Sequence, residues 1–158
     1  YVGVHLVTSD LKRAVSTMDT VRAQIPGNLV RSYQAHPALR ERNYGSFEGK
    51  PKEKVREAPG HQTYWQLPTV AERQRVKLAD DVETDIQIVL RVRNLVNQII
   101  VERKETIGKE LLVISTHGNT LRTVLSAVFN NPNYPPLKNA EHVLFSVADW
   151  NQMIVTNN

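Results

Sequence analysis

Three segments of the chain carry side chains that could bind and cleave a phosphate ester. The first, "VTSDLKRA", contains Arg13; the second, "LRERNYGSFEGKPKE", contains Glu41; the third, "ISTHGNTLR", contains His117. An arginine offers paired N–H groups to two phosphate oxygens. A carboxyl group with a raised pKa can give a proton to a leaving oxygen. We therefore expect the three segments to form one phosphate site.

Each of these residues also has an ordinary structural explanation. Arg13 could be a surface cation like its neighbour Lys12, and His117 could be a hydrogen-bonded structural histidine. The second segment could be a charged surface loop with two turn glycines, and it holds a second candidate acid, Glu48. We favour the phosphate site because a strand, a polar turn and a helix recur around both Arg13 and His117.

The residues around these two turns predict strands that run directly into helices. "VGVHLVT" reads as a short strand, and the apolar residues after Asp10 recur every three or four positions, as on one face of a helix. "LLVIS" before His117 shows no alternation, which is typical of a strand covered on both faces in a parallel sheet. The carboxyl ends of such strands meet at one edge, where helix N-termini offer N–H groups to anions.

Local signals predict where the elements begin and end. Ser9 or Asp10 is expected to cap the first helix, and Asn119 or Thr120 the last long one. Gly118 is expected to allow a tight turn before that helix. The other predicted elements are a strand at 28–33, short helices near 52–57 and 70–78, a long helix from Thr84 to Gly108 with a Thr84–Gln87 capping box, and two strands in 141–158 around a turn near 149–151.

The alternation of strands and helices predicts the fold class. We expect one domain over residues 1–158, with a three-layer α/β/α structure and a mostly parallel central sheet. A length of 158 residues and a hydrophobic content of 41% are sufficient for one core. No window approaches the run of about 18 apolar residues that a membrane-spanning helix needs.

Composition narrows the choice of partner and compartment. The chain has no cysteine and a formal net charge of +4. The lack of cysteine excludes disulfides and thiolate metal sites and permits a reducing compartment, so we expect a cytoplasmic protein. The positive charge suits a small phosphorylated substrate or inorganic phosphate, whereas no motif favours nucleic acid or a membrane. No cofactor or metal is expected, and the oligomeric state cannot be read from the sequence.

"TSDLKRAVST", "LRERNYGSFEG" and "VISTHGNTLRTVL" resemble, in order and spacing, the motifs of the histidine phosphatase superfamily, the phosphoglycerate mutase-like proteins. In that family the segments read approximately S-S-x-L-x-R-A-x-x-T, L-x-E-x-x-x-G-x-x-E-G and S-H-G-x-x-x-R. "DVET" resembles the family's G-E-S/T segment, with Val82 in place of glycine, and Thr116 stands where serine is usual. The resemblance spans nearly the whole chain and implies the family's fold.

The resemblance implies a role for each residue of the motifs. Arg13 resembles a phosphate-binding arginine, and Glu41 resembles the acid that protonates the leaving oxygen. His117 resembles the second pocket histidine, which contacts the phosphate and stabilises its transferring charge. Gly118 and Asn119, which follow in the same motif, are expected to bind the substrate.

The stretch "ERNYG" is close to the "ERHYG" of cofactor-dependent phosphoglycerate mutases and to similar stretches in fructose-2,6-bisphosphatases. This match implies that Arg42, Tyr44 and Lys52 contact anionic groups of the substrate. Glu48 matches the glutamate of the family's E-G pair, which we expect to be structural.

The family's nucleophile is a histidine in an R-H-G motif, and the chain contains no Arg-His-Gly. Of its five histidines, only His117 is followed by glycine, and it already matches the second pocket histidine. We therefore expect the nucleophile and its strand to lie upstream of Tyr1. Without that strand, the sheet is expected to have two unpaired edges inside the core.

The resemblance implies a phosphomonoester hydrolase that acts through a phosphohistidine on a small metabolite, such as a sugar phosphate or a compound of the phosphoglycerate or fructose-2,6-bisphosphate type. Phosphoglycerate mutase-type phosphotransfer is an alternative, although the mutases add long insertions after the acid loop and residues 53–83 are short. A non-catalytic phosphate-binding or scaffold domain is another, favoured by the missing R-H-G. The 158 residues alone are expected to be inactive, because none of them can form the phosphoenzyme.

Overall fold

The computed structural model describes residues 1–106, 108–138 and 141–156. Contacts along the backbone divide the chain into two compact units. Unit 1 comprises residues 1–41 and 91–117, and unit 2 comprises residues 42–90 and 118–158. A single domain over residues 1–158 stays a prediction.

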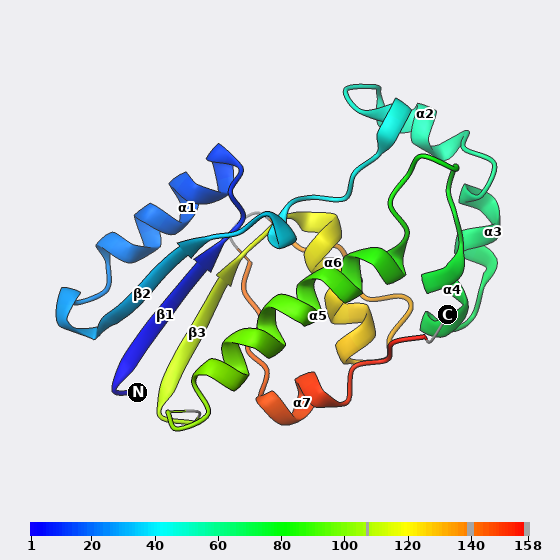
Figure 1. The fold of residues 1–158 in the computed structure, drawn as a ribbon. Coiled ribbons are helices and arrows are strands. Elements are labelled where there is room, and N and C mark those ends of the chain that lie inside the picture. The colour runs from blue at the N-terminus through cyan, green and yellow to red at the C-terminus, as the bar shows by residue number, and fades with distance from the viewer. Residues whose placement is uncertain (107, 139–140, 157–158) are drawn as a thin grey trace. The chain divides into compact units, whose positions relative to one another are not determined.

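Unit 1 is built on a parallel sheet with the strand order β2-β1-β3 (Figure 1). The strands are β1 (Gly3–Thr8), β2 (Val30–Ala35) and β3 (Glu110–Ser115). β1 lies in the middle and is buried along its whole length. Because all three strands run in the same direction, their carboxyl ends meet at one edge of the sheet, as predicted.

The sheet has no gap beside β1. β1 pairs with β2 on one side and with β3 on the other, in register from Gly3 opposite Glu110 to Thr8 opposite Ser115. The described sheet ends at β2 on one side and at β3 on the other, so the expectation of two unpaired edges inside the core stays a prediction. Direct pairing of β1 with β3 satisfies the backbone N–H and C=O groups that a gap would have left without partners.

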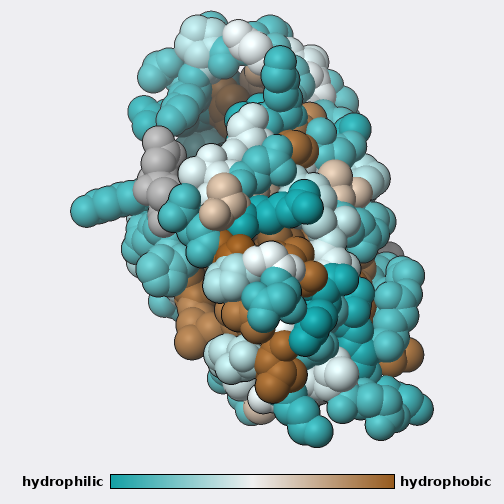
Figure 2. Space-filling view, turned by 90° about the vertical axis from the view of Figure 1, so that its left-hand side faces the viewer, coloured by the Kyte–Doolittle hydropathy of each residue, from teal (hydrophilic) through white to brown (hydrophobic). Residues whose placement is uncertain are grey.

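Helix α1 (Lys12–Ala23) covers one face of the sheet. Met18 of this helix packs against Val4 and Leu6 of β1. The helix begins after Leu11 and has no side-chain cap, so the predicted cap at Ser9 or Asp10 is wrong. Figure 2 views the molecule from the side on which α1 and β2 lie, where most of the surface is hydrophilic. Helix α1 is thus amphipathic, as its spacing predicted.

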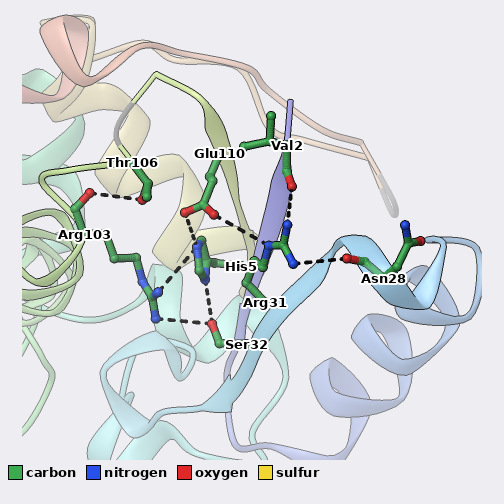
Figure 3. Close-up of polar contacts among 8 residues, drawn as sticks. All are labelled: Val2, His5, Asn28, Arg31, Ser32, Arg103, Thr106 and Glu110. Atoms are coloured by element: carbon green, nitrogen blue, oxygen red, sulfur yellow. Dashed lines mark hydrogen bonds and ion pairs between the residues drawn. The ribbon is translucent and has the colours of Figure 1, made fainter.

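The opposite face of the sheet carries a buried polar cluster (Figure 3). His5 of β1 lies between Ser32 of β2 and Glu110 of β3, with both ring nitrogens 2.8 Å from a side-chain oxygen. Arg103 follows helix α5 (Asp85–Glu102) and lies 3.4 Å from both His5 and Ser32. The carboxylate of Glu110 accepts hydrogen bonds from Thr106 and from Nε2–H of His5, and these hydrogen bonds lower its pKa.

Helix α5 begins in unit 2 and ends in unit 1. The backbone N–H of Thr84 donates to the Gln87 side chain at 2.8 Å, which is one half of the predicted capping box. Unit 1 also has two short 3-10 helices, η1 (Gly27–Leu29) and η2 (Pro37–Leu39). With α1 on one face of the sheet and the end of α5 reaching the other, helices cover both faces, as predicted.

Unit 2 is formed mainly by helices. Its described elements are η3 (Gly45–Phe47), α2 (Lys52–Arg56), α3 (His61–Gln66), α4 (Val70–Arg75), the start of α5, α6 (Gly118–Val128) and α7 (Val147–Asn151). The short helices predicted near 52–57 and 70–78 are confirmed, whereas α3 is not predicted from the sequence. Among the described residues, no helix combines the length and the apolar character needed to cross a bilayer.

The two strands predicted near the C-terminus are wrong in the described part, residues 141–156. Helix α7 occupies the predicted turn, and Ser146 caps it in a reciprocal capping box with Asp149. Farther along, the Gln74 side chain donates to Ile154 O at 2.7 Å and accepts from Thr156 N–H at 3.0 Å. A side-chain amide thus bonds the backbone groups that a strand would have used for pairing. Residues 157–158 lie outside the described part.

Two glycines of the loop after Arg42 have backbone angles that favour glycine. Gly45 has φ +53° and Gly49 has φ +72°. A Cβ atom on Gly45 would lie 2.4 Å from the backbone oxygen of Asp81, whereas one on Gly49 would meet no atom within 4 Å. An added side chain would therefore cause backbone strain at both positions, but steric overlap only at Gly45.

We expect Gly45→Ala to destabilise the protein more than Gly49→Ala. Each substitution adds about 1–2 kcal/mol of left-handed backbone strain. Only Gly45→Ala adds an overlap with backbone, which typically costs about 1–3 kcal/mol more. Denaturant unfolding of the two variants measures the difference. Equal free energies of unfolding would show that the loop does not pack against Asp81.

Candidate active site

The carboxyl ends of β1 and β3 in unit 1 bring the first and third motifs together. Thr8 and Ser115 are the last paired residues of these strands, and the backbone N–H of Ser9 donates to Ser115 O at 2.9 Å. After β1 the chain turns into α1, whose first turn carries Arg13. After β3 it leads through Thr116 to His117. Each side chain thus leaves one of two neighbouring strands at the same edge of the sheet.

Arg13, His117 and Ser9 are in direct contact. Arg13 Nε donates to His117 Nδ1 at 3.2 Å, and His117 Nε2 lies 2.8 Å from Ser9 Oγ. An arginine N–H can only donate, so Nδ1 accepts and the neutral ring carries its proton on Nε2. His117 then donates this proton to Ser9. The contacts with Arg13 and Ser9 are therefore both satisfied by the Nε2–H tautomer of His117.

Electrostatics keep His117 neutral. Its pKa is lowered first by burial, because only 8% of the residue is exposed, and next by the positive charge of Arg13. The negative charge of Glu41 acts in the opposite direction but does not reverse the shift. A protonated ring would carry a proton on Nδ1 and lose the hydrogen bond from Arg13. The lowered pKa and the observed hydrogen bonds thus describe the same neutral form.

The segment that leads to Glu41 is held against the ends of the strands. His36 N–H donates to Thr8 O at 2.8 Å, and Thr116 Oγ1 donates to Leu39 O at 2.7 Å. Arg91 donates to the backbone oxygen of Ala38, which precedes Leu39. These three contacts fix the course of the chain up to Arg40. They also give Thr116, where the family has serine, a hydroxyl contact of its own.

Asp10 and Arg40 form a further link to this segment. Arg40 donates to both carboxylate oxygens of Asp10, at 2.7 and 2.6 Å, and lowers the pKa of that carboxyl group. Asp10 is therefore not the predicted helix cap, because its side chain points to Arg40. Ser9 is not the cap either, because its hydroxyl bonds His117. As an exposed ion pair this link contributes little stability, but it places Glu41 beside the β1 turn.

Glu41 is half-buried and close enough to His117 for its charge to affect the pKa of the ring. Unit 1 therefore brings together Arg13, Glu41 and His117, the three residues predicted to be catalytic. Their catalytic roles stay predictions. The sequence did not predict the contacts of Ser9 or the Asp10–Arg40 pair. The place of Ser9 at the end of a strand could have suggested that Ser9 contacts His117.

Three residues predicted to bind substrate lie in unit 2. Arg42 is buried and donates to Asp85 and, at 3.2 Å, to Thr123. Tyr44 packs on the apolar core of the unit, and Lys52 is the exposed first residue of α2. The sequence did not predict the buried Arg42–Asp85 pair, because its partners are 43 residues apart. Contacts of Arg42, Tyr44 and Lys52 with a substrate stay predictions.

The remaining motif residues have simple local surroundings. Glu48 accepts the backbone N–H of Tyr44 at 2.7 Å, a contact that supports the loop. Gly118 and Asn119 are exposed in the first turn of α6. Asn119 and Thr120 lie inside this helix, so the prediction that one of them caps it is wrong. A Cβ atom on Gly118 would meet no atom within 4 Å, so the turn does not require glycine, contrary to expectation.

Comparison with known proteins identifies relatives of the chain. The model of the histidine phosphatase superfamily (branch 1) matches residues 2–156. No curated protein sequence matches the chain. Solved structures that resemble it include mycobacterial phosphatases and hydrolases and a phosphoglycerate mutase, and three of the similar structures are described next.

A mycobacterial glucosyl-3-phosphoglycerate phosphatase in complex with inorganic phosphate has 21% identity and a TM-score of 0.61, over 85% of this chain and 65% of that one. A phosphoglycerate mutase from Bacillus anthracis str. Sterne has 19% identity and a TM-score of 0.64, over 96% and 74%. YhfR of Bacillus stearothermophilus has 25% identity and a TM-score of 0.58, over 85% and 62%. The chain thus has the predicted phosphoglycerate mutase-like fold, and it spans 65% of the length of the mycobacterial phosphatase.

The lowered pKa of His117 predicts a pH-dependent contribution to stability. Below the usual histidine pKa of about 6.5, the unfolded chain takes up a proton at this residue before the folded chain does. The contribution is therefore complete above that pH and is lost as the pH falls through the folded pKa. Relative to His117→Gln, the wild type should lose free energy of unfolding between pH 7.5 and pH 5.

Denaturant unfolding at several pH values tests this expectation. His142→Gln, which removes an exposed histidine, controls for the loss of a titratable group. A constant difference between the wild type and His117→Gln across the pH range would contradict a lowered pKa.

Proposed function

The chain belongs to the histidine phosphatase superfamily, and we propose that it takes part in the hydrolysis of a phosphomonoester through a phosphohistidine intermediate. The observation that carries this proposal is the contact of Arg13 with His117 at the carboxyl edge of the sheet. Only Nε of Arg13 is used in this contact, so its two Nη groups are left to bind phosphate oxygens as a planar fork. His117 accepts from Arg13 through Nδ1 and donates its Nε2–H to Ser9, so the ring holds the guanidinium group in place at this edge.

In the proposed reaction, a histidine attacks phosphorus and the bond to the leaving oxygen breaks. Arg13 stabilises the charge on the phosphoryl oxygens, and His117 holds its guanidinium group in position. Glu41 gives its proton to the leaving oxygen, and its carboxylate then takes a proton from the water that attacks the phosphohistidine. This step releases phosphate and restores the attacking histidine.

The attacking histidine of this proposal lies outside the 158 residues. His5 has both ring nitrogens bonded, to Ser32 and Glu110. His36 Nδ1 accepts the N–H of Ala38 at 3.0 Å, and no glycine follows either residue. The absence of an Arg-His-Gly sequence supports the same conclusion.

The proposed substrate is a small phosphorylated metabolite, of the sugar phosphate, phosphoglycerate or fructose-2,6-bisphosphate type. The structural similarity to a glucosyl-3-phosphoglycerate phosphatase supports this class. The similarity to a phosphoglycerate mutase keeps phosphotransfer as a second candidate. Incubation of the complete gene product with such esters separates the two, since a hydrolase releases inorganic phosphate and a mutase forms an isomeric ester.

We expect the 158-residue chain to bind inorganic phosphate or vanadate without hydrolysing phosphate esters. Binding follows from Arg13 and His117, and the lack of turnover follows from the missing nucleophile. A calorimetric titration with phosphate, repeated for Arg13→Ala, measures the first part. Lys12→Ala, which removes an exposed neighbouring charge, is the matched control.

Two results would contradict this expectation. Phosphate release by the purified chain that His117→Ala abolishes would make His117 the nucleophile. Equal phosphate affinity of the wild type and Arg13→Ala would remove Arg13 from the site and, with it, the proposed function.

In the complete gene product, Glu41→Gln should slow the hydrolysis of alkyl phosphates by about 10²- to 10⁴-fold, the usual contribution of general acid catalysis. The loss should be much smaller for p-nitrophenyl phosphate, whose leaving group needs little protonation. Glu48→Gln is the control, because Glu48 supports the loop through Tyr44 N–H. It should lower the melting temperature more than the rate. A leaving-group effect at Glu48 would transfer the acid role to it.

A further inference from the structure

The hydroxyl group of Ser9 has its acceptor capacity in use. Ser9 is fully buried, and its oxygen lies 2.8 Å from His117 Nε2 and 3.3 Å from the backbone N of Leu11. A serine hydroxyl has two acceptor lone pairs and one O–H donor. Leu11 donates its N–H, and His117 donates Nε2–H because Arg13 occupies Nδ1. Both lone pairs are therefore used, and the O–H can only donate to a third group.

We propose that Ser9 is a phosphate-binding and positioning residue of this site, which holds His117 in the Nε2–H tautomer and donates its own O–H to a phosphate oxygen. The proposal rests on the proposed function, because it needs an anion beside Arg13 and His117. A phosphate oxygen is suited to this place because it only accepts. A group that offered a hydrogen would meet an oxygen with no lone pair left.

The location of Ser9 supports both parts of this role. Its backbone N–H is bonded to Ser115 O, so the residue is fixed to the end of β3. It is the first residue after β1 and precedes the helix that carries Arg13. Alanine at this position would leave the N–H groups of His117 and Leu11 without an acceptor inside a buried region, and the imidazole would be free to change tautomer.

The chain provides a matched control in the same sheet, in the contact between Ser32 of β2 and His5 of β1. Ser32 Oγ lies 2.8 Å from His5 Nδ1 (Figure 3). The same distance separates Ser9 Oγ from His117 Nε2. His5 is also buried, at 4% exposure. Ser32→Ala therefore removes a comparable serine–histidine contact that lies away from the proposed phosphate site.

The test is a phosphate titration of the 158-residue chain, followed by NMR of the ¹⁵N-labelled histidine rings. His117→Gln identifies the signals of His117. The wild type should show the Nε2–H tautomer of His117 before phosphate is added. Ser9→Ala should show a mixture of tautomers and bind phosphate about 10- to 100-fold more weakly, as expected for a lost hydrogen bond to an anion. Ser32→Ala should change only the signals of His5 and keep the wild-type affinity.

The outcomes separate this inference from the proposed function. If the wild type binds phosphate through Arg13 but Ser9→Ala binds equally well with an unchanged tautomer, Ser9 has no such role and the proposed function stands. If the wild type does not bind phosphate, both fail. If Ser9→Ala does not fold, Ser9→Thr, which keeps the hydroxyl, should retain the tautomer and Ser9→Cys, a much weaker donor, should lose affinity. Equal affinity of these two variants would overturn the proposal.

Discussion

The pairing of β1 with β3 is the constraint on which the rest of unit 1 depends. Because the two strands are parallel and in register, their last residues, Thr8 and Ser115, lie side by side. The segments that follow the two strands therefore begin at the same edge of the sheet. One segment turns into α1 and the other continues to His117. The contact of Arg13 with His117, which are 104 residues apart, follows from this single ladder. The strand pairing, and not a loop, thus brings Arg13 close to His117.

The two buried histidines of unit 1 show how neighbours select one form of an imidazole ring. At the amino end of the sheet, the carboxylate of Glu110 draws the proton of His5 to Nε2. At the carboxyl end, Arg13 donates to Nδ1 of His117, so the proton of this ring is also on Nε2. The first ring is part of a closed network of side chains. The second is bonded to Arg13, a residue whose other N–H groups are not bonded to described residues.

Much of this arrangement could be predicted from the sequence. The strand–turn–helix pattern around Arg13 and His117 predicted the parallel strands and the helices after them, because apolar periodicity and the succession of strand, turn and helix are local signals. The polar contacts could not be predicted in the same way. The contacts of Asp10 with Arg40 and of Arg42 with Asp85 form only in the folded chain, and no sequence spacing indicates them. The prediction of C-terminal strands was wrong for a related reason, since the Gln74 side chain bonds backbone groups of Ile154 and Thr156 that β pairing would have used.

β2 contains one residue more than its partner strand over the same length. Val30 lies opposite Val4, whereas Ser32 lies opposite His5, so Arg31 is an extra residue. Val30 and Tyr33 consequently pack on the same face with Met18, although three positions, an odd number, separate them. Arg31 thus reverses the inside–outside parity of everything that follows it in β2. If Arg31 were instead paired in a regular ladder, it would lie opposite His5, and Ser32 would turn toward the apolar face and Tyr33 toward the face of His5, without any change in the identity of either side chain.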